Sequence, residues 1–244
     1  NDGKSPLPFN HVKHQNVDMF LLDTSWGPTF AFKDIGQQMV AQLLNYYLAR
    51  SQKKAVIVVD TSGDTGPAAI SAVKNCPYLS IYCLYPDKRV SNIQELQMIT
   101  VQEENVHVYR TDGNNDEQST TLKVLFEDKE FVKKHTIISI NSINWGRILI
   151  QSSYYVWSYL DMIKRNTTNI DQVEYNIVPS GAFGNAMGGF LAYRMGLPIG
   201  KIICGTNKND IVMRTLTSGD MSWNSMNYPT VSPAMDIQFA CMLY

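Results

Sequence analysis

The sequence has little of several features that would place it in a specialised class. Its cysteines are scattered and form no Cys-x-x-Cys pair, so they indicate neither a zinc site nor a disulfide framework; they are Cys76, Cys83, Cys204 and Cys241. No apolar run approaches the roughly 18 residues of a membrane span. The first residues, Asn-Asp-Gly-Lys-Ser-Pro, lack an initiator methionine and the apolar core of a signal peptide. We therefore expect a piece of a longer chain, in a reducing, cytoplasmic setting, with no membrane partner and no metal.

An excess of charge of one sign is also absent. The 244 residues include 21 Lys and Arg against 22 Asp and Glu, a net charge of −1. This balance offers no electrostatic surface for DNA, RNA or anionic lipid, so we expect no nucleic-acid partner. A hydrophobic content of 44% with 11% aromatics excludes a disordered chain, and the length fits one large domain or two modest ones.

What the sequence does have is an alternation of two patterns. Runs rich in β-branched residues are nearly continuously apolar, which predicts parallel strands covered on both faces, at residues 55–59, 79–84, 106–109, 136–140, 175–178 and 201–204. Helices are predicted between them, at residues 34–50, from about 68, 91–98, 117–134, 145–164 and 184–195. In the first helix a four-residue spacing marks one apolar face, formed by Ile35, Met39, Leu43 and Tyr47. The alternation predicts an α/β fold, in which ligands bind beyond the carboxyl ends of the strands.

The first segment that could carry chemistry is Trp-Gly-Pro-Thr-Phe-Ala-Phe-Lys-Asp at residues 26–34, which leads into the first long helix. Lys33 has Phe30, Phe32 and Ile35 around it and a helix N-terminus beside it. An apolar wall and a positive helix end both disfavour the ammonium form and are expected to lower the lysine pKa. A neutral lysine can form a Schiff base with an aldehyde. The alternative is a helix-start lysine whose amine reaches water.

The second segment is Asp-Thr-Ser-Gly-Asp-Thr-Gly-Pro at residues 60–67, between a predicted strand and a predicted helix. Hydroxyls and backbone N–H groups clustered at such a turn form a nest for a carboxylate or a phosphate. The alternative is an ordinary helix cap made by Ser62, Asp64 or Thr65.

The third segment is Asn-Ser-Ile-Asn-Trp-Gly-Arg at residues 141–147, again after a strand and before a helix. Ser142, Asn144 and Arg147 offer a hydroxyl, an amide and a bidentate guanidinium, a set that suits an oxyanion such as phosphate. The alternative is turn and cap chemistry with a solvated arginine.

The fourth segment is Val-Pro-Ser-Gly-Ala-Phe-Gly-Asn-Ala-Met-Gly-Gly at residues 178–189. Glycine lets the backbone approach closely, so several N–H groups can converge on a phosphate at the start of the following helix. The spacing matches neither the dinucleotide fingerprint nor the P-loop, which argues against NAD and nucleoside triphosphates. The alternative is a plain turn between a strand and a helix.

Taken in order, the four segments resemble the motifs of the threonine synthase family of pyridoxal-phosphate (PLP) enzymes of fold type II. The cofactor-lysine, substrate-loop, substrate-phosphate and cofactor-phosphate motifs of the family resemble, in that order, residues 27–34, 62–66, 141–147 and 179–185. Further family patterns match residues 207–210 and 232–237, and details of the animal threonine synthase-like branch match residues 95–98, 105–108 and 132–135. The resemblance extends to Gln238.

The resemblance implies an α/β, tryptophan-synthase-β-like PLP fold with two parallel-sheet domains. The small domain would span residues 28–141, with the cofactor lysine and the substrate loop. Residues 1–27 and 142–244 would form part of the large domain, which binds the PLP phosphate and whose C-terminal portion is missing. The sequence does not define an oligomeric state.

Site roles follow from the same resemblance. Lys33 would hold PLP covalently and then act as the mobile base, and Asp64 would lie near the cofactor's 3-hydroxyl. The PLP phosphate would rest on the backbone of Gly181, Ala182, Phe183, Gly184 and Asn185. The substrate's carboxylate or phosphate would contact Ser62 and Thr65, and its phosphate would be bound by Ser142, Asn144 and Arg147.

The implied activity is elimination of phosphate from O-phosphohomoserine or O-phosphothreonine, with PLP as the electron sink. The product is threonine if water adds at Cβ, or 2-oxobutyrate and ammonia if hydrolysis follows release. One alternative is a truncated, non-catalytic secreted factor of the same family, cytokine-like and osteoclastogenic, in which the Asn-Thr-Thr sequon at residues 166–168 is usable. Another is a different fold type II enzyme, such as a serine/threonine deaminase.

The sequence departs from the family at three places. Trp26 stands where relatives usually carry histidine, and Ala182 stands where many synthases have asparagine. After Gln238 relatives continue into a long region that supplies the hydroxyl partner of the pyridine nitrogen. We therefore expect the full protein to be an enzyme and this polypeptide by itself to be poorly active.

Overall fold

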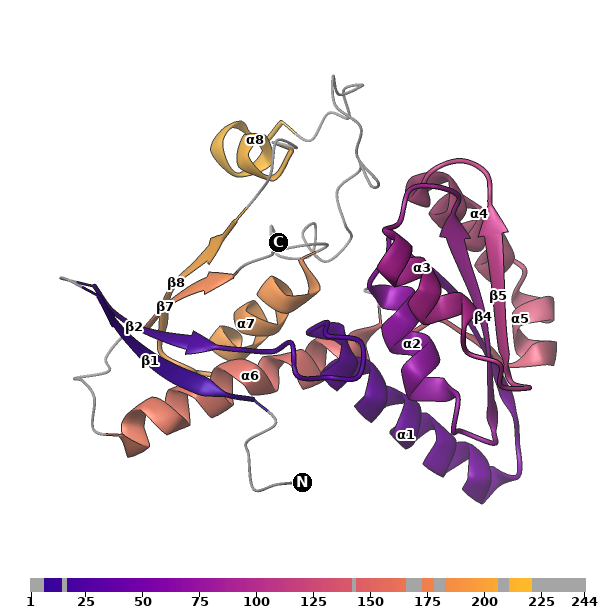
Figure 1. Ribbon diagram of the computed structural model, residues 1–244, viewed down its shortest axis with the longest axis horizontal. Coiled ribbons are helices and arrows are strands. Elements are labelled where there is room, and N and C mark those ends of the chain that lie inside the picture. The colour runs from indigo at the N-terminus through magenta and orange to yellow at the C-terminus, as the bar shows by residue number, and fades with distance from the viewer. Residues whose placement is uncertain are drawn as a thin grey trace.

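A parallel four-stranded sheet lies at the centre of one part of the computed structural model (Figure 1). The structure describes residues 7–14, 17–141, 144–165, 173–177, 183–205 and 211–220. The sheet has the order β5-β4-β3-β6, from β3 (Ala55–Asp60), β4 (Leu79–Pro86), β5 (Val106–Thr111) and β6 (Ile137–Ile138). All four strands fall on predicted runs. The side chains of Ile57, Val59, Ile81 and Cys83 are fully buried, which explains why the runs are almost continuously apolar.

Helices cover both faces of this sheet (Figure 1). One face carries α1 (Lys33–Ser51), α2 (Thr65–Val73) and α3 (Asn92–Ile99), and the other carries α4 (Asn115–Glu127) and α5 (Lys129–His135). The prediction of a single helix at residues 117–134 is wrong, because two helices, α4 and α5, occupy this range. The chain leaves the helical conformation at Asp128, whose carboxylate accepts a hydrogen bond from the Phe131 N–H and caps α5.

The apolar stripe predicted on α1 does not face the core. Met39, Leu43 and Tyr47 are exposed, and only Ile35 of that stripe is partly buried. The buried face instead combines small and apolar residues with polar ones, namely Lys33, Asp34, Gly36, Gln37, Val40, Ala41 and Leu48. The core-facing stripe of α1 is the neighbouring one, in which Val40, Ala41, Leu44 and Leu48 pack in the cluster around the four-stranded sheet. The first turns of α1 lie against another helix, α6 (Trp145–Lys164).

The second part of the molecule is built around α6 and α7 (Gly184–Arg194). It contains the parallel pair β7 (Val173–Ile177) and β8 (Ile199–Cys204), an antiparallel hairpin of β1 (Phe9–His14) and β2 (Val17–Leu22), and α8 (Ile211–Ser218). Both parallel strands and both long helices were predicted, whereas the hairpin and α8 were not. In the described residues no helix is long and apolar enough to span a membrane.

Two hydrophobic clusters form the core of these parts. The first surrounds the four-stranded sheet, and the second contains Tyr154, Tyr155 and Phe183 with residues of α7 and β8. Ile35 of α1 packs on the second cluster and Ile150 of α6 on the first, so α1 and α6 join the two. The domain boundaries given above stay a prediction.

Close packing of α6 and α7 depends on a glycine pair in α7. A Cβ on Gly188 would lie 3.0 Å from the backbone carbon of Gln151, and a Cβ on Gly189 would lie 2.7 Å from the ring of Tyr155. That ring is buried and its hydroxyl is hydrogen-bonded, so it has no room to yield. By contrast, a Cβ on Gly36 of α1 would make ordinary contacts of 3.5 Å.

We predict different effects on stability for two glycine-to-alanine changes. Gly189→Ala forces a methyl group against the Tyr155 ring and is expected to lower the free energy of unfolding by about 1–3 kcal/mol. Gly36→Ala has space for the methyl group and removes a flexible residue from a helix, so unfolding in urea should be unchanged or occur at slightly higher concentration. Equal losses in both variants would contradict the packing described.

Candidate active site

Lys33 is the first residue of α1, and its side chain is only 9% exposed. Its Nζ lies 5.9 Å from the centre of the Phe32 ring, so one of the apolar groups expected around the amine is present. Phe30 does not contribute, because its side chain is 76% exposed and its backbone adopts a positive φ of 60°. Most of the lysine therefore lies within the protein rather than on its surface.

The backbone before Lys33 is fixed by the buried carboxylate of Asp34. This carboxylate turns back and accepts hydrogen bonds from the N–H and the hydroxyl of Thr29, at 2.9 and 2.7 Å. Gly27 is needed here, since a Cβ would lie 2.2 Å from Asp34 Oδ2. The segment therefore forms a closed turn that leads directly into α1.

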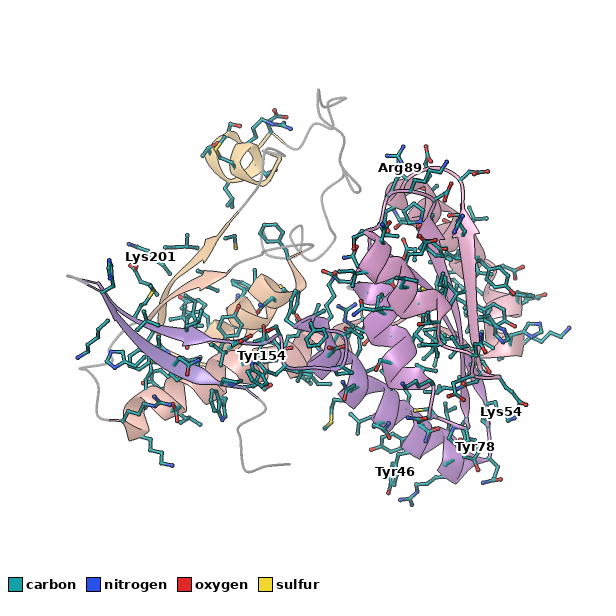
Figure 2. The ribbon with its side chains drawn as sticks, viewed as in Figure 1. Tyr46, Lys54, Tyr78, Arg89, Tyr154 and Lys201 are labelled. Carbon is teal, nitrogen blue, oxygen red and sulfur yellow. The ribbon has the colours of Figure 1, made fainter. Side chains whose placement is uncertain are left out.

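Two consecutive tyrosines on α6 bring the starts of α1 and α7 together. The hydroxyl of Tyr154, labelled in Figure 2, donates to the carbonyl of Phe32 at 2.9 Å. The hydroxyl of Tyr155 donates to both the backbone oxygen and Oδ1 of Asn185 at 2.9 Å. Because the two tyrosines are neighbours in the chain, the helix start that carries Lys33 and the turn at the head of α7 lie on the same stretch of α6.

The N-cap residue of α7 makes no side-chain cap bond to the first turn of the helix. Phe183 is the buried N-cap, with a φ of 62°, and neither it nor any acidic residue satisfies the first turn of the helix. Gly184 follows, with the amide of the buried Gln151 3.6 Å from the position of a Cβ. Asn185 is the partner of Tyr155. Gly181 and Ala182 lie outside the described residues.

Side-chain caps differ among the helices that begin at the predicted motifs. In α3, α4, α5 and α6 the side chain of the N-cap residue accepts a hydrogen bond from a first-turn N–H. These N-cap residues are, in order, Ser91, Asn114, Asp128 and Asn144. The N-cap residues of α1, α2 and α7 make no side-chain cap bond, although Thr61 in the preceding loop accepts from the Gly66 N–H in the first turn of α2. A helix start without a cap presents backbone N–H groups and a partial positive charge, which suit an anion.

The loop between β3 and α2 is organised by Thr61, which the sequence did not single out. Its hydroxyl oxygen accepts hydrogen bonds from the N–H groups of Gly63 and Gly66 at 3.0 and 2.9 Å, so part of the predicted nest is already occupied. Thr65 is buried and Ser62 is exposed. Asp64 is the N-cap of α2, but its carboxylate makes no cap bond, so the capping alternative is wrong for this residue.

Two glutamines of α3 connect that loop to the lysine segment. Gln94 Nε2 donates to Asp64 Oδ1 at 2.6 Å while its Oε1 accepts from the Ser91 N–H, so the amide is held at both ends. Gln97 Nε2 donates to the Thr29 carbonyl at 3.3 Å. Neither residue was predicted. The Ser-x-x-Gln capping box at residues 91–94 was the available signal, although it reveals only the start of α3.

In the segment at 141–147, the described residues Asn144 and Arg147 make hydrogen bonds within the protein. Asn144 caps α6, accepting from the Arg147 N–H at 3.3 Å and donating to the Ser139 carbonyl at 2.9 Å. The guanidinium of Arg147 is 1% exposed and donates to the Ile140 carbonyl at 2.9 Å, so the arginine is not solvated. Ser142 lies outside the described residues. The substrate role of the three residues stays a prediction.

Comparison with known proteins decides the family. No family model matches the chain. Over 228 residues it is 40% identical to threonine synthase-like 2 of Pongo abelii, covering 93% of this chain and 47% of that protein. Over 244 residues it is 42% identical to threonine synthase of Saccharomyces cerevisiae, covering 97% and 47%. The crystal structure of PLP-bound threonine synthase from Brucella melitensis matches with a TM-score of 0.77 at 40% identity, over 95% of this chain and 48% of that one.

The chain belongs to the threonine synthase family. The predicted parallel α/β fold of PLP type II is thereby confirmed, since the described strands and helices match those of solved threonine synthases. The chain spans about half the length of the curated relatives it matches.

The buried position of Arg147 generates a prediction about stability. Arg147→Met removes a buried guanidinium and its bond to the Ile140 carbonyl, and is expected to lower the free energy of unfolding by about 1.5–3 kcal/mol. The matched control, Arg89→Met, changes an exposed arginine and should alter it by less than about 0.5 kcal/mol. Equal urea midpoints for the two variants would show that the Arg147 guanidinium does not support the junction of α1 and α6.

Proposed function

We propose that this chain supplies the cofactor lysine and the phosphate-binding turn of a PLP-dependent lyase in the threonine synthase family. The observation that carries the proposal is the junction on α6. There, a nine-tenths-buried lysine at the start of α1 and an uncapped helix start at α7 are tied to neighbouring tyrosines. A reactive aldehyde and a phosphate on one small molecule match these two features.

The residues present fit PLP. Lys33 provides a buried primary amine, and Phe183, Gly184 and Asn185 provide a helix start with no side-chain cap and no nearby acid in its first turn. The absence of a side chain at Gly184 leaves room beside the Gln151 amide. The solved relative from Brucella melitensis is described as PLP-bound, which supports the same cofactor here. Gly181 and Ala182 would complete the backbone cradle.

Lys33 and Asp64 would have different roles in the reaction. PLP, when bound, supplies an electron sink for charge that develops at the substrate's Cα. Lys33 would anchor the cofactor and then accept the Cα proton of the substrate. Asp64, which Gln94 holds in place, would contact the cofactor's 3-hydroxyl. The substrate's C–O bond would then break and its electron pair would leave with the phosphate. In O-phosphohomoserine, whose phosphate is on Cγ, a Cβ proton would have to be removed before this bond breaks.

The proposed substrate is a phosphorylated amino acid, O-phosphohomoserine or O-phosphothreonine. Ser62 and Thr65 would bind its carboxylate or phosphate, and Ser142, Asn144 and Arg147 would bind its phosphate. The product would be threonine if water adds at Cβ, or 2-oxobutyrate and ammonia if hydrolysis follows release. The names of the curated relatives support this class of chemistry, and none of those cited supports a secreted, non-catalytic factor.

The first test is covalent attachment of PLP. The purified chain mixed with PLP should develop a visible absorbance band, and borohydride reduction followed by mass spectrometry should place the label on Lys33. Lys33→Ala should lose both signals. The matched control Lys54→Ala, which changes an exposed lysine, should keep them. A label that persists in Lys33→Ala, or that lies on another lysine, would overturn the assignment.

Substrate class is tested on the same PLP-loaded chain. O-phosphohomoserine and O-phosphothreonine are expected to change the visible spectrum at lower concentration than homoserine, threonine or serine, because only the former carry a phosphate group. A stronger response to serine or threonine would favour a deaminase of the same fold instead.

A further inference from the structure

We propose that Tyr154 and Tyr155 are positioning residues with separate roles. Tyr154 would set the position of Lys33, and Tyr155 would set the turn that receives the cofactor's phosphate. This inference rests on the proposed function. It adds two residues that position the site without touching the substrate or the cofactor.

Tyr154 acts on the peptide group immediately before Lys33. Its hydroxyl donates to the Phe32 carbonyl, and Phe32 is the N-cap of α1 with no side-chain cap of its own. A carbonyl oxygen has two lone pairs, so it accepts this bond together with the first bond of the helix. The tyrosine therefore fixes the peptide plane from which the lysine side chain leaves the backbone.

The surroundings of Tyr154 keep it a donor. Its side chain is 2% exposed, and burial raises the pKa of its hydroxyl well above the usual range. The positive charge of Arg147 lowers that pKa and the negative charge of Asp34 raises it. The phenol is thus protonated at neutral pH and its proton is available to the Phe32 carbonyl.

Tyr155 acts on the other end of the cofactor site. Its hydroxyl donates to Asn185, the second residue of α7, at both the backbone oxygen and Oδ1. The ring is held under Gly189, whose missing side chain leaves room for it, and the backbone oxygen of Tyr155 accepts from the Tyr175 hydroxyl at 3.1 Å. Tyr155 therefore orients the first turn of α7.

Helix geometry explains why neighbouring residues reach different elements. Consecutive side chains of an α-helix point about 100° apart, so Tyr154 reaches α1 while Tyr155 reaches α7. Each hydroxyl can be removed by a change to phenylalanine that keeps the ring and its packing. The two variants are consequently matched controls for each other.

The test separates covalent attachment of PLP from total binding. For Tyr154→Phe, the fraction of bound PLP that borohydride fixes to Lys33 should fall about fivefold, the effect of one ordinary hydrogen bond. Tyr155→Phe should leave that fraction unchanged but weaken total PLP binding by a similar factor. General destabilisation would instead lower total binding to the same extent in both variants and leave both fixed fractions unchanged, and that result would overturn the inference.

A second measurement needs no cofactor. Acetic anhydride labelling followed by mass spectrometry should modify Lys33 faster in Tyr154→Phe than in the unaltered chain or in Tyr155→Phe, because the helix start is no longer held. Equal labelling rates and equal fixed fractions in all three proteins would overturn the inference while PLP still binds at Lys33. If PLP does not attach to Lys33 in the unaltered chain, the proposed function itself fails, and this inference fails with it.

Discussion

Packing of α6 against the starts of both α1 and α7 is the constraint on which the rest of the site depends. The two hydrophobic clusters belong to different sheets, and α6 with α1 connects them. The glycine pair in α7 lets the helices approach, and the tyrosine hydroxyls fix which residues meet. A lysine and a helix start that are about 150 residues apart in the sequence thereby share one region.

The same junction explains why α1 violates the simple amphipathic rule. Its buried face near the N-terminus carries Lys33, Asp34 and Gln37, and the facing surface of α6 carries Arg147 and Gln151. Burying such groups costs free energy unless they are hydrogen-bonded. Asp34 is hydrogen-bonded to Thr29, and one N–H of Arg147 donates to the Ile140 carbonyl. Among the described residues, Oε1 of Gln37 and Oε1 of Gln151 are buried without a hydrogen-bond partner. Met39, Leu43 and Tyr47 lie on the exposed side of the helix.

Much of the fold could be predicted because its signals are local. Strands covered on both faces read as continuous apolar runs, and α6 begins at a recognisable cap, Asn144. The first strand of the hairpin, β1, has no such run: most of its side chains are exposed, and Lys13 and two histidines interrupt it. The break at Asp128 was also missed, although four consecutive charged residues at 127–130 interrupt the apolar spacing there.

The site was predictable only in part, because only some of its signals are local in the sequence. The four motif segments could be found by composition and by resemblance, whereas the groups that position them could not. Gln94 lies 30 residues from Asp64, and Tyr154 lies 122 residues from Phe32. Such pairs leave no periodic or local pattern. The resemblance also gave no sign that Asn144 and Arg147 are engaged with the backbone of residues 139, 140 and 147.

The most direct test of the central claim is a crystal structure of the chain with PLP bound. The account predicts that the phosphate lies against the backbone at the start of α7, and that the aldehyde carbon is bonded to Lys33 Nζ, with the Tyr154 and Tyr155 hydrogen bonds intact. A phosphate seated at the start of α2 instead, or an aldehyde remote from Lys33, would contradict it.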